Sequence, residues 1–477
     1  MTEINPKHPS SELWTWDAAD LAHGIRCRTI SSREAVAACL ARLEAVNPKI
    51  NAVVVALGEA ALAEADKADA AVARGEPLGP LHGVPITIKI NVDQIGQATS
   101  NGVVAFRDVI AAEDSPVVAN FKRAGAVILG RTNTPAFSSA WSTENDLFGR
   151  TLNPWSQGHT PGGSSGGASA SVAAGITPIA HGNDFAGSVR YPAYCTGLVG
   201  LRPSFGRIPA FLPTAKVERA LSGQLMSVQG PLARRVRDIR LALLAMAQED
   251  PRDPWWVPAP LQGSPVPRPI RVALAPDPAG TGVHPTVAEA VRRAGAILAA
   301  AGYAVEEVNP PEFAAVAKEW ANITREEASH YTTPAIEQYG DARLRKTHAW
   351  MTGNAGAPDA LAYMQALARR TTWIRQWNLF LRDHPLLLIP TSFAPPFELD
   401  REIESIDSAR YVRDIQMPSF VIPVLGLPAV SVPTGIADGL PTGVQIVAPR
   451  FREDLILDAA EIIEAHCPMP TPIDPRF

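Results

Sequence analysis

The sequence is poor in the residues that mark several common protein classes. It has only four cysteines in 477 residues, with no CxxC pair and no clustering of cysteine with histidine. This excludes a disulfide framework and a thiolate metal site. We therefore expect Cys27, Cys39, Cys195 and Cys467 to be reduced thiols in the core of a cytosolic protein.

Long apolar runs and blocks of one charge are also missing. No apolar segment approaches the roughly 18 residues of a membrane-spanning helix, and the chain does not start with a cationic segment followed by an apolar one. We expect neither a membrane protein nor a secreted one. The net charge of -5 is spread along the chain, so we expect no nucleic-acid partner. HExxH and similar ligand clusters are absent, and we expect no metal and no cofactor.

What the chain does have is an alternation of helix and strand patterns, with 46% hydrophobic residues to fill a large core. Ser31 begins a capping box with Glu34, and Pro116 opens a second helix that ends before Gly125. These signals predict an α/β fold with a mixed central β-sheet sandwiched by α-helices. Further predicted helices cover 168–174, 285–301 and 453–466, and predicted strands cover 84–90, 126–129, 271–275, 303–308, 386–389 and 429–432.

No sharp boundary divides the chain. The proline-rich residues 251–269 resemble a linker, but predicted strands occur on both sides of them. We expect a single domain over residues 1–477. It would contain an N-terminal helical region at 1–75, a catalytic core at 76–240, and the rest of the sheet with the substrate pocket at 241–477. We also expect a homodimer, although no sequence feature fixes the oligomeric state.

A glycine-rich loop, TPGGSSGG, occupies residues 160–167. A flexible linker is the simplest interpretation, but the helix that follows at once aims the loop amides outward. A phosphate-binding loop would need a Gly-Lys-Ser/Thr continuation, which is missing. A nucleophile elbow around Ser164 would need a strand before it, whereas residues 153–161 carry two prolines and no apolar run. The loop therefore fits neither a nucleotide site nor an esterase triad.

Lys89 lies in an apolar strand, where a single lysine usually faces solvent. Here Ile86, Ile88 and Ile90 fill one face of the strand, while Thr87 and Lys89 share the other. In a sheet covered on both faces, Lys89 would therefore be buried. Burial of an ammonium without a partner lowers the pKa of the lysine, which leaves a neutral amine able to act as a base.

The segment 181–192 supplies a serine for that base. Ser188 follows Ala186 and Gly187, small residues that let the backbone turn sharply and expose several amides around one point, as an oxyanion hole requires. A tight structural turn is the simpler alternative. His181 is the nearest conventional base, but we expect it at a strand end, where a buried, hydrogen-bonded histidine is the commoner outcome.

The order and spacing of these motifs resemble those of the amidase signature family, whose members use a Ser, cis-Ser, Lys triad. The resemblance implies the amidase signature fold and hydrolysis of a carboxylic amide, with esters, lactams or hydrazides as further substrate classes. It extends from the N-terminal helices to the end of the chain. The matching segments are GPLHGVP at 79–85, GRTNTP at 130–135, LFGRTLNPW at 147–155, GLRP at 200–203 and GLPTGVQIV at 439–447.

The resemblance assigns roles position by position. Ser188 becomes the nucleophile that forms an acyl-enzyme, Ser164 the bridging serine after a cis peptide bond, and Lys89 the neutral base. A small-molecule amide is the implied substrate. The oxyanion hole would be formed by the backbone amides of Phe185, Ala186, Gly187 and Ser188.

Three positions depart from the family pattern. Ile90 replaces an aspartate, Asn183 a threonine and Ala186 a glycine. None of them removes a triad atom, so we expect an active enzyme. The segment around Asn183 and Ala186 is similar to that of the cyclic-amide (nylon oligomer) hydrolases of the family.

Substrate choice is the least constrained part of the prediction. In relatives, residues 135–147 and 417–423 border the acyl pocket, which makes Phe137, Ser138 and Trp141 candidate substrate contacts and favours an aryl or medium apolar acyl group. Two alternatives to a stand-alone amidase remain open. One is the glutamine-hydrolysing subunit of a tRNA-dependent amidotransferase, which would need partner subunits. The other is a non-catalytic binding relative, which the complete triad disfavours.

Overall fold

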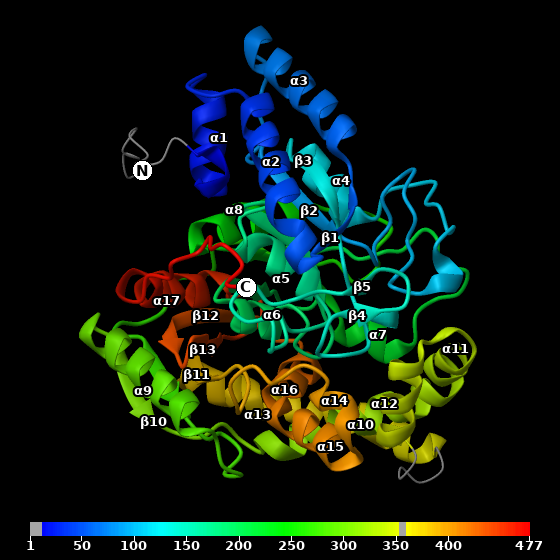
Figure 1. Ribbon diagram of the computed structural model, residues 1–477. Coiled ribbons are helices and arrows are strands. Elements are labelled where there is room, and N and C mark those ends of the chain that lie inside the picture. The colour runs from blue at the N-terminus through cyan, green and yellow to red at the C-terminus, as the bar shows by residue number, and fades with distance from the viewer. Residues whose placement is uncertain (1–11, 353–358) are drawn as a thin grey trace.

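One mixed β-sheet runs through the centre of the protein (Figure 1). The computed structural model describes residues 12–352 and 359–477. Eleven of the described strands form this sheet, and β4 (Glu144–Asn145) and β5 (Gly149–Arg150) form a separate hairpin. The strands of the sheet are β1 (Val53–Ala56), β2 (Pro85–Lys89), β3 (Val127–Thr132), β6 (Ile179–Asp184), β7 (Val199–Arg202), β8 (Val228–Ala233), β9 (Arg271–Leu274), β10 (Ala304–Glu307), β11 (Leu386–Pro390), β12 (Ala429–Ala437) and β13 (Leu440–Val447).

The order of the strands is β1-β3-β2-β6-β8-β7-β12-β13-β11-β9-β10. Strands β3, β2 and β6 are parallel to one another, as are β11, β9 and β10 at the other end. The strands between these two groups pair antiparallel. The predicted mixed α/β sheet is therefore confirmed.

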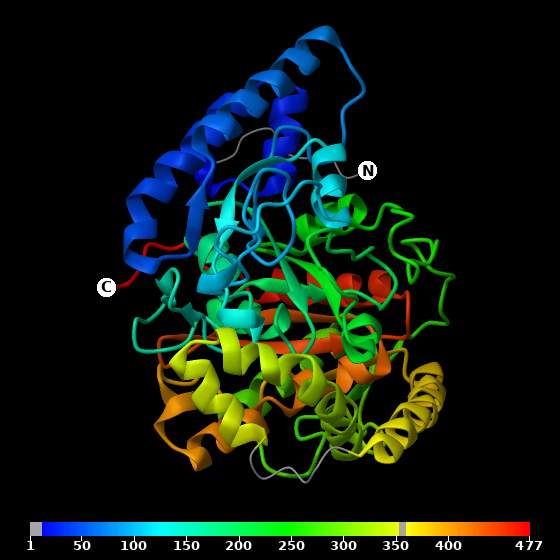
Figure 2. The same cartoon turned by 90° about the vertical axis from the view of Figure 1, so that its right-hand side faces the viewer.

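Helices cover both faces of the sheet (Figures 1 and 2). One face packs against α1, α4, α8, α9 and α17, and the other against α5, α6, α10, α13 and α16. The helices are α1 (Ala18–Arg26), α2 (Ser32–Ile50), α3 (Gly58–Arg74), α4 (Pro116–Arg123), α5 (Gly166–Ala173), α6 (Arg190–Thr196), α7 (Leu221–Met226), α8 (Val236–Met246), α9 (Pro285–Ala300), α10 (Phe313–His330), α11 (Thr332–Tyr339), α12 (Ala342–Thr352), α13 (Ala360–Asp383), α14 (Arg401–Glu404), α15 (Ile406–Ile415), α16 (Met417–Leu425) and α17 (Glu453–His466).

Strand β11 shows why the sheet needs cover on both faces. Leu386 and Leu388 belong to the core on one side, whereas Leu387 and Ile389 belong to the core on the other. All four side chains are fully buried, and each such burial contributes roughly 1.5–3 kcal/mol to folding. A continuous apolar run is therefore required, because successive side chains point to opposite faces.

Several predicted elements are present at their predicted positions. Helix α17 matches the predicted 453–466, and α2 has the predicted capping box, in which the Glu34 amide donates to Ser31 Oγ and the Ser31 amide donates to Glu34 Oε2. Strand β8 was not predicted, because Gly230 and Pro231 interrupt its apolar pattern. Helices α10 to α13 were not predicted either.

The proline-rich residues 251–269 contain no helix or strand. The central sheet nevertheless joins strands from both sides of this segment, since β7, which precedes it, pairs with β12, which follows it. The segment therefore connects two parts of one sheet.

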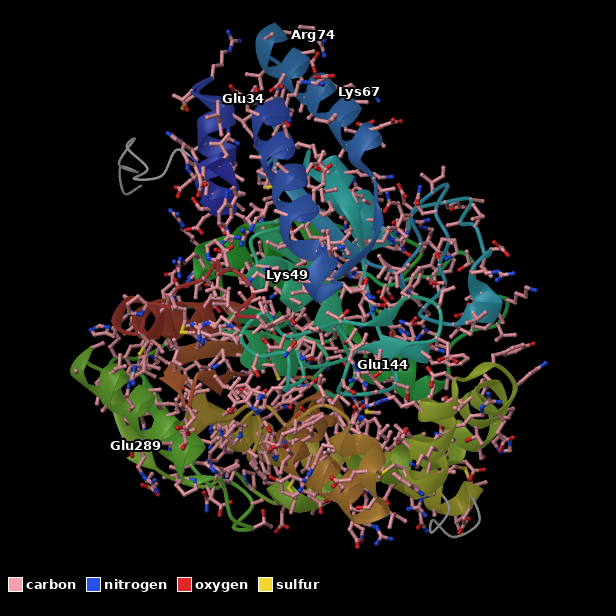
Figure 3. All side chains as sticks on the ribbon, in the orientation of Figure 1. Glu34, Lys49, Lys67, Arg74, Glu144 and Glu289 are labelled. Carbon is pink, nitrogen blue, oxygen red and sulfur yellow. The ribbon has the colours of Figure 1, made fainter. Side chains whose placement is uncertain are left out.

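Charged side chains such as Lys67 and Arg74 on α3 point outward (Figure 3). Among the described helices, none combines the length and the apolar character needed to cross a membrane.

The prediction of four core cysteines is wrong at one position. Cys39, Cys195 and Cys467 are buried, but Cys27 is exposed because it caps the C-terminus of α1 at the surface.

Candidate active site

Lys89 stands at the end of β2 and is fully buried. Its neighbours Ile86 and Ile88 pack into the core on one face of the sheet, so Lys89 reaches the opposite face, as predicted. Its Nζ atom lies 2.7 Å from Ser164 Oγ, 3.1 Å from Ser165 Oγ and 2.9 Å from Asn183 Oδ1. The amine therefore meets two hydroxyl groups and one amide oxygen in the interior of the protein.

Burial lowers the pKa of Lys89 well below its ordinary value. The nearby carboxylate of Asp184 acts in the opposite direction, but it does not outweigh the loss of hydration. Asp184 is itself held by two guanidinium groups, with Arg190 at 3.0 Å and Arg202 at 3.4 Å. Its charge is therefore engaged by these two arginines, and the amine has no carboxylate partner within hydrogen-bond distance among the described residues.

Burial alone would raise the pKa of Asp184, but Arg190 and Arg202 outweigh it and hold that pKa below its ordinary value. The pKa of Arg202 is lowered by burial to about 9, so this guanidinium keeps its charge near neutral pH. The Asp184 group also accepts hydrogen bonds from the backbone amides of Gly187 and Val189. One carboxylate thus ties the end of β6 to the turn that follows it.

This arrangement predicts a large loss of stability in Asp184→Asn. The substitution leaves Arg190 and Arg202 buried without a counter-charge, which we expect to lower the free energy of unfolding by about 3–5 kcal/mol. Urea unfolding measures the change. The matched control is Asp66→Asn, which removes an exposed ion pair with Arg33 and should change stability by less than about 1 kcal/mol. A small and equal loss of stability in Asp184→Asn and Asp66→Asn would contradict a stabilising role of the Asp184 carboxylate.

The glycine-rich loop lies against this site in a fixed conformation. The peptide bond between Gly163 and Ser164 is cis, as predicted. Thr134 Oγ1 donates to the carbonyl of Ser164 at 2.9 Å, and Thr143 Oγ1 donates to the carbonyl of Gly162 at 2.9 Å. A Cβ atom on Gly163 would lie 2.4 Å from the carbonyl oxygen of Ala140. Only glycine therefore fits at this position without movement of the neighbouring backbone.

Ser188 lies on the turn between β6 and α6, and its residue is 9% exposed. Its carbonyl accepts a hydrogen bond of 3.3 Å from the amide of Ser165, so this turn is held against the glycine-rich loop. Gly187 has a φ of +86°, and a Cβ atom there would lie 2.1 Å from Ser419 Oγ. The turn thus requires glycine immediately before Ser188.

The structure differs from the predicted oxyanion hole at one of the four backbone amides, that of Gly187. The amide of Gly187 already donates to Asp184 Oδ1 at 3.0 Å, so it is turned toward that carboxylate. The other three predicted donors, the amides of Phe185, Ala186 and Ser188, donate to no acceptor among the described residues.

Asn183 stands out in the sequence only as a departure from the family pattern, yet it contacts Lys89. Its Oδ1 atom also accepts from Asn91 Nδ2 at 3.3 Å, and its Nδ2 atom donates to Asn91 Oδ1 at 2.9 Å. Asn91 in turn donates to Ser138 Oγ at 2.9 Å. Sequence reasoning missed Asn91, because nothing local indicates a contact between residues 92 positions apart.

His181 does not belong to the reacting groups. Its ring is fully buried, with Nδ1 3.4 Å from the Lys89 amide and Nε2 2.8 Å from Gln229 Oε1. Burial lowers the pKa of His181 to about 3, so the ring stays neutral. The interpretation of this residue as a buried, hydrogen-bonded histidine is confirmed.

The three predicted substrate contacts lie in different surroundings. Trp141 joins an aromatic cluster with Phe185, Trp320 and Phe420, in which neighbouring ring centroids are 4.8 to 5.6 Å apart. Phe137 instead packs on Phe106 in another cluster. Ser138 donates to Asn101 and accepts from Asn91. Of the three, only Trp141 therefore lies in the aromatic cluster beside the turn that carries Ser188.

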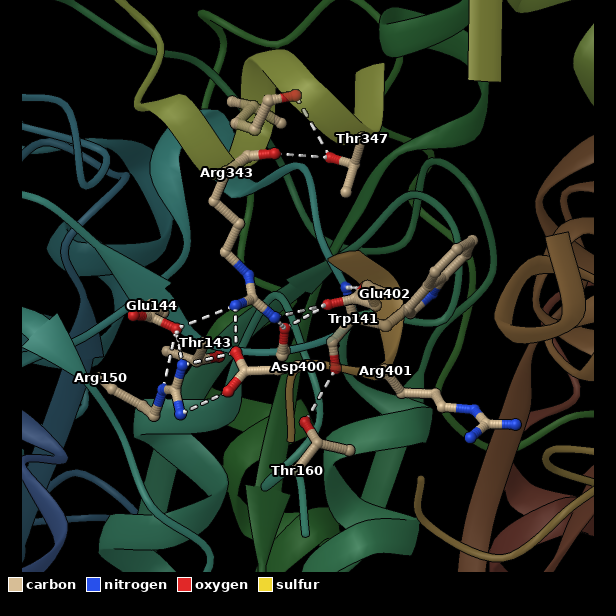
Figure 4. A network of polar contacts seen from close by, with 12 residues as sticks. Trp141, Thr143, Glu144, Arg150, Thr160, Arg343, Thr347, Asp400, Arg401 and Glu402 are labelled. Atoms are coloured by element: carbon tan, nitrogen blue, oxygen red, sulfur yellow. Dashed lines mark hydrogen bonds and ion pairs between the residues drawn. The ribbon is translucent and has the colours of Figure 1, made fainter. Parts of the chain in front are cut away.

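The backbone around Trp141 is fixed by a polar network (Figure 4). Glu402 accepts from the Trp141 amide at 3.0 Å and from the hydroxyl of Ser142. Thr160 Oγ1 donates to the Trp141 carbonyl at 3.1 Å. Arg343 approaches Glu402 and also joins an ion-pair network, whose other members are Asp400, Arg150 and Glu144.

A buried amine with a lowered pKa, two serines and a turn with free amides are together typical of an amide-hydrolysing serine enzyme. The comparisons with known proteins agree with this class. The amidase family model matches residues 34–457, and the chain belongs to the amidase signature family. It is an enzyme that hydrolyses carboxylic amides.

Three relatives illustrate the range of the family. An indoleacetamide hydrolase of Bradyrhizobium diazoefficiens is 48% identical over 461 residues, which cover 96% of this chain and 87% of the relative. A glutamyl-tRNA(Gln) amidotransferase subunit of Moorella thermoacetica is 35% identical, with 95% and 97% covered. The solved structure of 6-aminohexanoate cyclic dimer hydrolase with its substrate has a TM-score of 0.83 at 31% identity, with 98% and 99% covered.

Proposed function

We propose that this enzyme hydrolyses primary amides of aryl-substituted acids through an acyl-enzyme on Ser188, with Ser164 and neutral Lys89 as proton relay. The observation that carries the mechanism is the position of Lys89 Nζ, fully buried and 2.7 Å from Ser164 Oγ. A charged ammonium at this place would lack a carboxylate partner. A neutral amine can also make all three hydrogen bonds of the site, and it needs no counter-charge.

The contacts of Lys89 fit this protonation state. A neutral amine has two N–H donors and one lone pair. Asn183 Oδ1 can only accept, so one N–H group belongs to it. The second N–H group is directed at Ser165 Oγ, and the lone pair accepts from the hydroxyl of Ser164. The shortest of the three contacts is the one along which the first proton would move.

The reaction then proceeds in two stages. Lys89 takes the proton of Ser164, which takes the proton of Ser188, and Ser188 Oγ attacks the amide carbon. The tetrahedral oxyanion is stabilised by the free amides of the turn. The relay runs backwards to protonate the departing nitrogen as the C–N bond breaks. Water, deprotonated by the same relay, cleaves the acyl-enzyme to a carboxylic acid and restores Ser188.

The surroundings of Ser188 support an aromatic acyl group. Phe185 belongs to the turn and Trp141 lies beside it, and both side chains are partly exposed, whereas the nearby charges of Arg343 and Glu402 are engaged in the ion-pair network. Free glutamine would bring an ammonium and a carboxylate, each of which loses hydration unless it is paired. The relative with 48% identity is named for an indole-substituted acetamide, which agrees with the same assignment.

A substrate panel tests this proposal. The purified chain alone is given indole-3-acetamide, phenylacetamide, L-glutamine and 6-aminohexanoate cyclic dimer, and the released ammonia or amine is measured, with Ser188→Ala as the blank. We expect kcat/KM for the two arylacetamides to exceed that for glutamine by about 100-fold or more. A preference for glutamine that appears only with added partner subunits would instead identify an amidotransferase subunit.

A further inference from the structure

Two indole N–H groups hold the backbone carbonyls of the turn that carries Ser188. Trp320 Nε1 donates to the carbonyl of Phe185 at 3.3 Å, and Trp141 Nε1 donates to the carbonyl of Ala186 at 3.1 Å. Trp320 comes from α10, more than a hundred residues further along the chain. These hydrogen bonds therefore connect the turn to two segments that are distant from it in the sequence.

The consequences of the two bonds differ, because each carbonyl belongs to a different peptide plane. In a trans peptide the C=O and N–H groups point in opposite directions, so a bond to one fixes the other. The plane between Ala186 and Gly187 is held at both ends, by Trp141 on its oxygen and by Asp184 on its N–H. The plane between Phe185 and Ala186 is held by Trp320 on its oxygen, and its N–H has no protein acceptor among the described residues.

We propose that Trp320 is a positioning residue for the oxyanion hole, because its indole N–H fixes the Phe185 carbonyl and thereby aims the Ala186 amide at the substrate oxygen. This inference rests on the proposed function. Trp320 acts through the backbone and transfers no proton.

The surroundings of Trp320 keep its ring in place for this role. The ring packs on Phe185 with centroids 5.3 Å apart and on Phe420 with centroids 4.8 Å apart. The preceding residue, Glu319, is 3% exposed and accepts from Arg369 Nε on α13 at 3.0 Å. Rotation of α10 would break this contact of the buried Glu319 carboxylate, so the indole N–H keeps its direction.

Trp320→Phe tests the proposal, because it removes the N–H group and keeps an aromatic ring. With phenylacetamide we expect kcat to fall about 10-fold and KM to change less than about 2-fold. The loss is smaller than the 100- to 1000-fold that follows removal of a donor, because the Ala186 amide remains and only its direction is freed. Acylation and deacylation both pass through an oxyanion, so kcat should fall whichever of the two steps limits the rate.

A transition-state analogue separates positioning from packing. The ketone 1,1,1-trifluoro-3-phenylpropan-2-one adds Ser188 Oγ to its carbonyl carbon, the serine proton passes to the relay, and the carbonyl oxygen becomes an oxyanion. We expect its inhibition constant to rise by the same factor of about 10, while that of the product phenylacetate stays unchanged. The control is Trp256→Phe, which removes an indole N–H bond of 3.2 Å to the Ala247 carbonyl away from the site and should alter none of these constants.

Three results would overturn the proposal. A raised KM with unchanged kcat and unchanged ketone affinity would make Trp320 a wall of the acyl pocket. Equal losses of affinity for the ketone and for phenylacetate would show general damage to the active site. Unchanged kinetic and inhibition constants would show that Trp320 does not position the oxyanion hole. If Trp320→Phe does not fold, 3-benzothienylalanine at position 320 keeps the ring shape without the N–H group. Activity in Ser188→Ala would refute the proposed function itself. If Ser188→Ala is inactive and Trp320→Phe keeps the wild-type constants, only this inference is refuted.

Discussion

Ser188→Ala is expected to lower kcat/KM for the preferred arylacetamide by about 10,000-fold or more, because alanine offers no oxygen to form the acyl bond. Alanine keeps the Cβ atom of the serine and removes only Oγ, so the variant should fold. Steady-state kinetics with phenylacetamide measure the loss, and a thermal unfolding curve confirms that the fold is kept.

A fluorophosphonate probe supplies the companion experiment. It should label the wild-type chain on the peptide that contains Ser188, and it should also label Ser264→Ala, which changes an exposed serine far along the chain. Ser188→Ala should remain unlabelled. Labelling of Ser164 or Ser165 in place of Ser188 would contradict the assignment of the nucleophile.

Lys89→Met is expected to lower kcat/KM by about 100- to 10,000-fold, the range that a positioned general base contributes. Methionine has a similar length and suits an apolar interior, so the variant removes the amine with little change in volume. Kinetics with phenylacetamide measure the effect. Lys49→Met, at an exposed lysine on α2, is the matched control and should keep wild-type activity. Unchanged activity in Lys89→Met would refute the assigned base.

Much of the site could be predicted because its parts are local. The alternation of Ile86, Ile88 and Ile90 with Lys89 was enough to place the lysine on the second face of a doubly covered sheet. The small residues before Ser188 indicated a turn with free amides. In both cases the determining physical factor, strand periodicity or the conformational freedom of glycine, acts within a few residues.

The remaining parts could not be predicted, because they depend on contacts between distant segments. The exchange of hydrogen bonds between Asn91 and Asn183 follows from the packing of β2 beside β6, and Trp320 reaches the turn only through the path of α10. Phe137 was assigned to the substrate site by position alone. Its backbone lies in the left-handed region, at a φ of 55°, where the chain turns and the ring packs on Phe106.

The proposed chemistry depends on an uncharged Lys89 in the resting enzyme. The most direct test is the pH dependence of the rate at which a fluorophosphonate labels Ser188. Since only the neutral amine can accept a proton, the wild-type rate should fall tenfold per pH unit below the lowered pKa of Lys89 and become constant above it. Lys89→Met should label slowly and lose this titration. A wild-type labelling rate that is independent of pH, or an identical titration in Lys89→Met, would contradict the account.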